Sequence, residues 1–227
     1  MQLWALGRAA NPATLEAEGP YPYISSSNVQ LAGKPVPPLP LTVNGKLEKQ
    51  HHGKAKLNFL NAEIHEYVQL YATAARNAIQ AGFDGVEIHG ANGYLVDQFT
   101  QYTANSRTDE YGGSVINRAR FALEVVEAVS KAIGESKTGI RFSPWGGFNG
   151  TRLEDFYLMT SRLIQINAGM RMSDPKPGFS YLVSELASRH PSLAYIHVVE
   201  PRAEGSMDRQ VQEGEVRLYE LRHRYTI

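Results

Sequence analysis

Three side chains that can handle a substrate oxygen and a proton stand close together in the segment 86–94, which reads VEIHGANGY. His89 and Asn92 can each offer an N–H to an oxygen, and the Tyr94 phenol can offer a proton. They follow a short run of strand type, 83–88, and occupy a glycine-containing turn. A histidine alone is more often structural, so the prediction of an active site depends on the whole His-x-x-Asn-x-Tyr pattern.

The elements that must position this turn follow from the spacing of apolar residues. A helix is predicted over 62–81, with Asn61 as a candidate cap and Gly82 suited to its end. Further helices are predicted over 117–133 and 179–188, and strands over 1–8, 83–88, 138–144 and 193–199. This alternation predicts parallel strands with right-handed crossovers. The expected fold class is therefore α/β, a partial (β/α)8 TIM barrel with about four of eight strands, forming one domain over 1–227.

Polar residues stand where three of these predicted strands end, namely His89, Arg141 and Glu200. In parallel sheets and barrels, functional groups collect beyond the carboxyl ends of the strands. We therefore expect these side chains to share one end of the sheet. No set of carboxylates and histidines at these ends has the spacing of metal ligands, which argues against a metal site and a metal-dependent barrel hydrolase.

The segment 9–60 is rich in proline, glycine, serine and asparagine, and the run PVPPLP at 35–40 has no helical period. We predict one long loop over 9–60. Loops of this length are uncommon, and they are usually functional or form lids.

Composition excludes several classes of function. The net charge is +0 at pH 7, which gives no electrostatic reason to expect nucleic acid or an anionic membrane as a partner. The count of cysteines is 0, so thiolate catalysis, disulfides and cysteine-ligated metals are excluded. No apolar run has membrane-spanning length, and the start lacks the features of a signal peptide. We expect a cytoplasmic protein.

A second motif follows the first by about twenty residues: RTDEYGGS at 107–114, followed by Asn117 and Arg118. Together with the segment 86–94, this motif closely resembles the old yellow enzyme family of flavin-dependent ene-reductases. The resemblance covers roughly 1–149 and 169–215. Within the second motif, we interpret the two arginines, 107 and 118, as partners of Asp109 and Glu110 in structural ion pairs.

The resemblance implies an FMN-binding barrel that takes hydride from NADPH and reduces an activated C=C bond of an enone-like substrate. His89 and Asn92 match the family's pair that binds the substrate oxygen, and Tyr94 matches its proton donor. Two further residues match cofactor-binding positions: Arg141 for flavin N1 and O2, and Gln2 for the pyrimidine edge. Trp4 falls where the family has an aromatic residue of the substrate pocket. The fungal look of the sequence makes a role in secondary metabolism an expectation.

The chain departs from the family pattern in three places. Two family strands that precede the position of Gln2 have no counterpart. Residues 150–168 interrupt a recognisable run, and we interpret them as an insert from a retained in-frame intron, the alternative being a genuine loop. Residues 216–227 have no family counterpart where phosphate-binding loops are expected. A second interpretation is therefore a non-catalytic fragment, truncated at both ends, that cannot hold FMN and exposes the edges and the apolar face of an open sheet.

Overall fold

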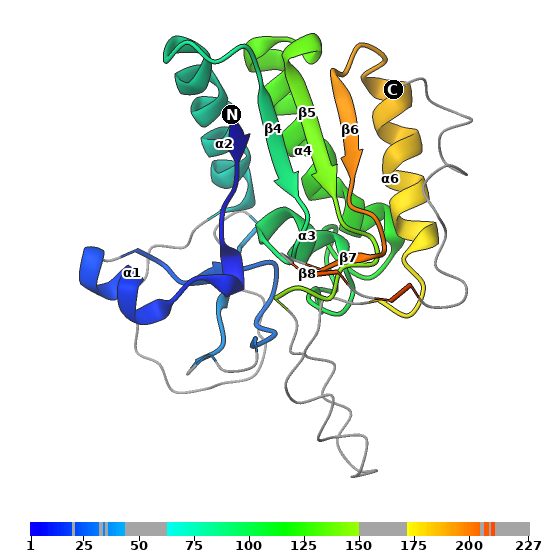
Figure 1. The fold of residues 1–227 in the computed structure, drawn as a ribbon. Helices are drawn as coiled ribbons and strands as arrows, with labels where there is room; N and C mark the ends of the chain where they lie inside the picture. The colour runs from blue at the N-terminus through cyan, green and yellow to red at the C-terminus, as the bar shows by residue number, and fades with distance from the viewer. Residues whose placement is uncertain are drawn as a thin grey trace.

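The computed structural model describes residues 1–19, 21–31, 34, 36–43, 63–149, 172–204, 207–208 and 210–211. Its centre is a four-stranded sheet in the order β1-β4-β5-β6 (Figure 1), and all three pairings are parallel. The strands are β1 (Gln2–Leu3), β4 (Val86–Gly90), β5 (Thr138–Phe142) and β6 (Tyr195–Val198). The predicted parallel α/β arrangement is confirmed, and the carboxyl ends of the strands meet at one edge.

Among the described residues, three long helices accompany the sheet, and each precedes the next of its strands: α2 (Ile64–Gln80) before β4, α4 (Val115–Ile133) before β5 and α6 (Lys176–Arg189) before β6. Helix α4 packs against both α2 and α6 (Figure 1). It begins after Ser114, whose side chain accepts a hydrogen bond from the backbone N–H of Asn117. Such a cap satisfies one of the N–H groups that a helix start leaves unpaired.

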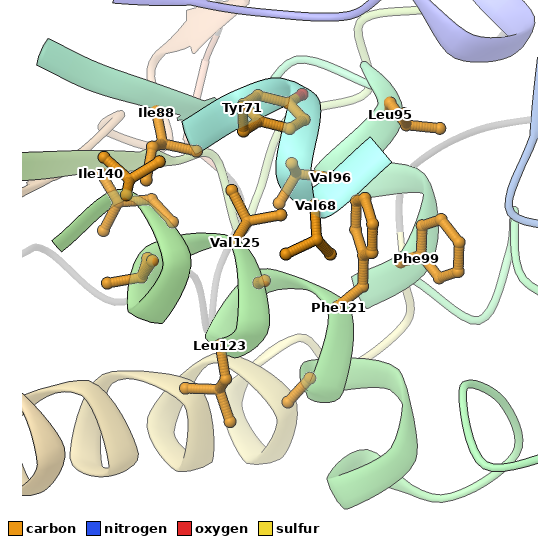
Figure 2. Close-up of a cluster of buried hydrophobic side chains, with 14 of the residues drawn as sticks. Val68, Tyr71, Ile88, Leu95, Val96, Phe99, Phe121, Leu123, Val125 and Ile140 are labelled. Carbon is orange, nitrogen blue, oxygen red and sulfur yellow. The ribbon is translucent and has the colours of Figure 1, made fainter. Parts of the chain in front are cut away.

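The hydrophobic core lies between this helical layer and one face of the sheet. Figure 2 shows Val68 of α2, Val125 of α4 and Ile88 of β4 gathered with Ile140 of β5, and all four are buried. Burial of each such side chain stabilises the fold by roughly 1.5–3 kcal/mol. The same core fixes the orientation of β4, because successive side chains of a strand point to opposite faces.

The opposite face of the sheet, here called the inner face, carries polar side chains. Since Val86 and Ile88 face the helices, Glu87 and His89 point the other way, and their cross-strand partners continue the pattern with Arg141 on β5. The expectation of an apolar open face is therefore wrong for the described strands, because alternation places charged and hydrogen-bonding groups there.

Two predictions near the N-terminus were wrong. The strand predicted over 1–8 is short, because β1 ends at Leu3 and a 3-10 turn η1 (Gly7–Ala9) follows. Within the stretch predicted as one loop, the structure has helix α1 (Pro12–Glu18) and the paired short strands β2 (Ile24–Ser25) and β3 (Leu39–Pro40). Asn11 caps α1 through its side chain, and Pro12 occupies the first turn. Both residues are ordinary helix-start signals that the general composition of the segment obscured.

Other boundaries differ modestly from the predictions. Helix α2 begins at Ile64 after Glu63, and Asn61 lies outside the described residues. The short helix α3 (Leu95–Thr100) was not predicted, and neither was the antiparallel pair β7 (Ala203–Glu204) with β8 (Met207–Asp208). The proposed insert 150–168 and the tail 216–227 also lie outside the described residues. In the part of the chain that is described, no helix has the length and apolarity to cross a membrane.

Candidate functional site

The predicted site residues are brought together by the register of the parallel sheet. His89 on β4 is the direct cross-strand partner of Arg141 on β5, and Arg141 is in turn the partner of His197 on β6. Two residues before His89 on the same face of β4, Glu87 is paired with Gln2 of β1. The inner face therefore presents two lateral rows: a first row that contains Gln2 and Glu87, and a second row of His89, Arg141 and His197. The second row lies nearer the carboxyl ends of the strands, where catalytic groups of such sheets are found.

Three aromatic rings, those of His89, Trp4 and Tyr94, are in mutual contact at the end of the second row. The rings of Trp4 and His89 are stacked with centroids 6.1 Å apart, and Tyr94 meets Trp4 edge-on at 4.7 Å and His89 at 5.0 Å. Edge-to-face and offset geometries of this kind are the favoured ones for aromatic pairs. His89 is buried at 3% exposure, whereas Trp4 is 54% exposed, so the three rings offer an open aromatic wall beside a buried imidazole.

His89 is electrically neutral at physiological pH in this setting. Burial, together with the positive charge of Arg141, lowers the pKa of His89 from 6.5 to about 4, although Glu87 acts in the opposite direction. Within the described structure, His89 Nδ1 and Arg141 Nε are buried and have no hydrogen-bond partner. Unpaired buried polar atoms are expensive, so two of them on neighbouring strands mark a place where a ligand can complete the hydrogen bonding.

Asn92 is held in a strained but well-supported backbone conformation. Its φ of 57° lies in the left-handed region, which asparagine tolerates better than most residues. Its backbone N–H donates to Ser143 Oγ at 2.7 Å, and its carbonyl oxygen accepts from Asn149 Nδ2 at 2.9 Å. Both partners follow β5, so the loop after one strand fixes the turn after its neighbour and leaves the Asn92 side chain available.

Gly93, between Asn92 and Tyr94, is held at both ends by buried side chains of α3. Its N–H donates to Asp97 Oδ2 at 2.9 Å, and its carbonyl oxygen accepts from Gln98 Nε2 at 2.7 Å. Gln98 also reaches the segment after β1, since Nε2 donates to the Leu6 carbonyl at 3.1 Å. Helix α3 thus ties the turn of 89–94 to the segment that carries Trp4.

Gly7 makes this tie possible, and its replacement gives a first prediction. Gly7 has a φ of +58°, and a Cβ there would lie 2.1 Å from Gln98 Oε1. We expect Gly7→Ala to lower the free energy of unfolding by about 3 kcal/mol, of which about 1 is backbone strain and the rest is lost Gln98 bonding. Gly113→Ala is the matched control, because Gly113 has a φ of +73° and open space around it. Equal losses in the two variants, measured by denaturant titration, would refute the role of Gln98.

Gln2, predicted to meet the flavin's pyrimidine edge, lies on the inner face at the edge of the sheet. Its Nε2 donates to Glu87 Oε1 at 2.5 Å, and the residue is otherwise exposed. The structure therefore places all six predicted site residues on or beside the inner face: Gln2, Trp4, His89, Asn92, Tyr94 and Arg141. Glu200, the third predicted strand-end residue, is exposed just beyond β6 and bonds to Arg202.

The RTDEYGGS motif supports the site without entering it. Arg107 forms the predicted ion pair with Asp109 and donates from Nη1 to the carbonyls of Ser26 and Leu41 at 2.7 and 2.6 Å. The ion-pair prediction is wrong for Arg118, which donates instead to backbone carbonyls, among them that of Thr100 at 3.1 Å. Buried arginines that bond to carbonyls hold loops in place, and here they fix the segments that flank α3.

Several residues that shape the site were missed from the sequence: Glu87, Asp97, Gln98 and Ser143. Glu87 had an available signal, because it stands two residues before His89 in a strand and must share its face. Asp97 and Gln98 gave no such signal, since their buried state depends on contacts with Gly93 and the segment after β1. Across the described ranges, no three histidine, aspartate or glutamate side chains gather closely enough to hold a metal ion.

A family model described as the NADH:flavin oxidoreductase / NADH oxidase family matches residues 1–224. The chain belongs to this family. Old Yellow Enzyme from Pichia sp. AKU4542 superposes with a TM-score of 0.64 and 34% identity over 89% of this chain and 47% of that one. The resemblance to old yellow enzyme and the partial (β/α)8 barrel predicted from the sequence are both confirmed.

Two curated relatives illustrate the range of the family. The chain is 47% identical over 208 residues to chanoclavine-I aldehyde reductase fgaOx3 of Penicillium roqueforti (strain FM164). The aligned region covers 92% of this chain and 46% of that protein. It is 60% identical over 98 residues to a probable flavin mononucleotide-dependent alkene reductase of Leishmania infantum, covering 43% of this chain and 27% of the relative. The chain therefore spans about half the length, or less, of these relatives.

Proposed function

We propose that this protein is an FMN-dependent oxidoreductase that uses NADPH to reduce the activated C=C bond of a small α,β-unsaturated carbonyl compound. The observation that carries the proposal is a pair of buried nitrogens, on His89 and Arg141, that have no hydrogen-bond partner among the described residues. The ring of Tyr94 lies edge-on to His89. Donors on adjacent strands next to a phenol suit a ligand with acceptor oxygens. Membership of a flavin oxidoreductase family supports the same function.

The residues of the inner face have the chemistry that FMN requires. The Arg141 guanidinium would stabilise the negative charge that builds at N1 and O2 on reduction, and the Gln2 amide would bind the pyrimidine edge. The observation that fits this assignment is Arg141 Nε, which has no partner within the part of the chain that the structure describes. When bound, FMN would supply hydride transfer between the nicotinamide and the alkene.

The turn of 89–94 would do the remaining chemistry. His89 and Asn92 donate hydrogen bonds to the carbonyl oxygen of the substrate and stabilise the negative charge that develops there, as an oxyanion hole does. A neutral His89 suits this role, because a ring N–H remains available as a donor without a competing counter-ion. Tyr94 would give a proton to the α-carbon of the substrate, and Trp4 would form a wall of the substrate pocket.

The substrate class follows from the same donors and is consistent with the names of the relatives. One relative is named for an aldehyde and the other for an alkene. A compound in which an alkene is conjugated to a carbonyl satisfies both descriptions, and it provides the oxygen that His89 and Asn92 require. Fungal secondary metabolism, to which the prediction from the sequence pointed, is a natural source of such compounds.

The test is an FMN titration of the purified chain, followed by flavin absorbance and fluorescence. We expect stoichiometric binding, and we expect Arg141→Ala to weaken it by about tenfold or more, since a charge-assisted hydrogen bond contributes about 1.5–3 kcal/mol. Arg76→Ala is the control, because Arg76 is exposed on α2 and donates a hydrogen bond to Thr73 of the same helix. A chain that does not bind FMN, or an Arg141 variant that binds it as tightly, contradicts the proposal and favours the non-catalytic interpretation.

A further inference from the structure

Glu87 lies at the centre of the first lateral row of the inner face and has no part in the reaction described above. The row runs from Gln2 on β1 through Glu87 on β4 and Gly139 on β5 to Tyr195 on β6, each residue being the direct cross-strand partner of the next. The Glu87 side chain is only 15% exposed. A carboxylate this far out of water needs donors around it.

The donors come from two strands, β1 and β6. Gln2 Nε2 donates to Glu87 Oε1 at 2.5 Å, and His197 Nδ1 lies 3.1 Å from Oε2. The Tyr195 hydroxyl also bonds to the carboxylate. Glu87 and Tyr195 lie on the strands on either side of β5, and the Tyr195 ring covers Gly139, which has no side chain. A Cβ at Gly139 would lie 2.6 Å from the Tyr195 ring.

The carboxylate acts only as an acceptor at neutral pH. Burial by itself would raise the pKa of Glu87, but the hydrogen bonds from Gln2 and His197 outweigh it and lower the pKa below its usual range. An ionised carboxylate has no proton to donate. It can therefore accept a hydrogen bond from the Gln2 amide N–H but cannot donate one to the amide oxygen. This requirement fixes which end of the amide faces Glu87.

We propose that Glu87 is a positioning residue that fixes the orientation of the Gln2 amide for the pyrimidine edge of the flavin. With one N–H bonded to Glu87, the amide keeps its carbonyl oxygen and its second N–H for the cofactor. The pyrimidine edge of a flavin presents an N3–H donor beside carbonyl acceptors, so it needs an acceptor and a donor in that fixed order. This inference rests on the proposed function, and it adds a residue that the family resemblance did not supply.

A double-mutant cycle on FMN affinity tests whether Glu87 acts through Gln2. We expect Glu87→Leu to weaken FMN binding by about tenfold in the otherwise unchanged chain and by no more than about twofold in a Gln2→Leu background, because residues in one hydrogen-bonded network are non-additive. Glu66→Leu on the exposed face of α2 is the control and should leave the affinity unchanged. Equal losses in both backgrounds, or no loss in either, overturn the proposal.

A measurement without flavin separates this inference from the proposed function. In the ¹⁵N NMR spectrum of the flavin-free chain, the two side-chain N–H signals of Gln2 should be well separated, because only one proton is bonded to Glu87. They should move to the positions of a free glutamine amide in Glu87→Leu. Unchanged signals overturn the orienting role whether or not FMN binds. A wild-type chain that shows the expected signals but binds no FMN refutes the proposed function, and with it the flavin role of Glu87.

Discussion

Replacing Tyr94 with phenylalanine is expected to slow alkene reduction by about 10²- to 10⁴-fold, the contribution typical of a positioned general acid. Phenylalanine keeps the edge-on contacts with Trp4 and His89, whose centroids lie 4.7 and 5.0 Å from that of Tyr94. Only the proton donor is lost. Bleaching of the flavin absorbance by NADPH should continue at nearly its normal rate, because that half of the cycle needs no proton for the α-carbon.

Stopped-flow measurements of the two half-reactions check this separation. Tyr67→Phe is the matched control, since Tyr67 lies on α2 and packs against the core on the other face of the sheet. We expect both half-reactions of that variant to match those of the unchanged chain. Loss of both half-reactions in Tyr94→Phe would contradict the assigned role and indicate a damaged site. Normal rates in both would mean that another group supplies the proton.

Replacing Asp97 with asparagine is expected to remove a large pH dependence of stability. Burial raises the pKa of Asp97 from 3.8 to about 7, although the bonds from Gln101 and Gly93 and the nearby Arg8 guanidinium favour the ionised form. The unfolded chain therefore loses this proton at lower pH than the folded chain does. Stability from this group is fully present below about pH 4 and is lost as pH rises to about 7.

The expected change in the free energy of unfolding follows from this pH range. The stability of Asp97→Asn relative to the unchanged chain should increase by about 3 kcal/mol between pH 5 and pH 8, at about 1.4 kcal/mol per unit of pKa difference. Asparagine can be accommodated, because the buried Gln101 Oε1 has no hydrogen-bond partner in the described structure and the amide can turn to accept from the new N–H. The bond from Gly93 to the remaining oxygen is then retained.

Denaturant titrations of both chains at pH 5, 7 and 8 provide the measurement, and the difference between the chains cancels the other titrating groups. Asp84→Asn is the control, since Asp84 is exposed in the turn before β4. A constant difference across the pH range would mean that Asp97 stays ionised beside Arg8 throughout. Asp97→Asn at pH 7 should keep the turn of 89–94 in place, because Gln98 still donates a hydrogen bond to the Gly93 carbonyl.

The amino-acid sequence by itself determined the elements whose information is local. Helices α2 and α4 and strands β4 and β5 lie close to their predicted ranges, because an apolar stripe at helical spacing or a run bounded by glycine reports the buried face of its own segment. The turn of 89–94 also carried its own chemistry, since its donors lie within six residues. The family followed from that turn and the RTDEYGGS motif.

Only the tertiary structure decided which distant residues join the turn. Trp4 meets Tyr94 across 90 positions, and Gln2 meets Glu87 across 85, because the register of a parallel sheet pairs strands that are far apart in the chain. Asp97 and Gln98 have polar side chains whose type predicts exposure, yet both are buried. Their burial depends on hydrogen-bond partners from other segments, which no local pattern of residues can reveal.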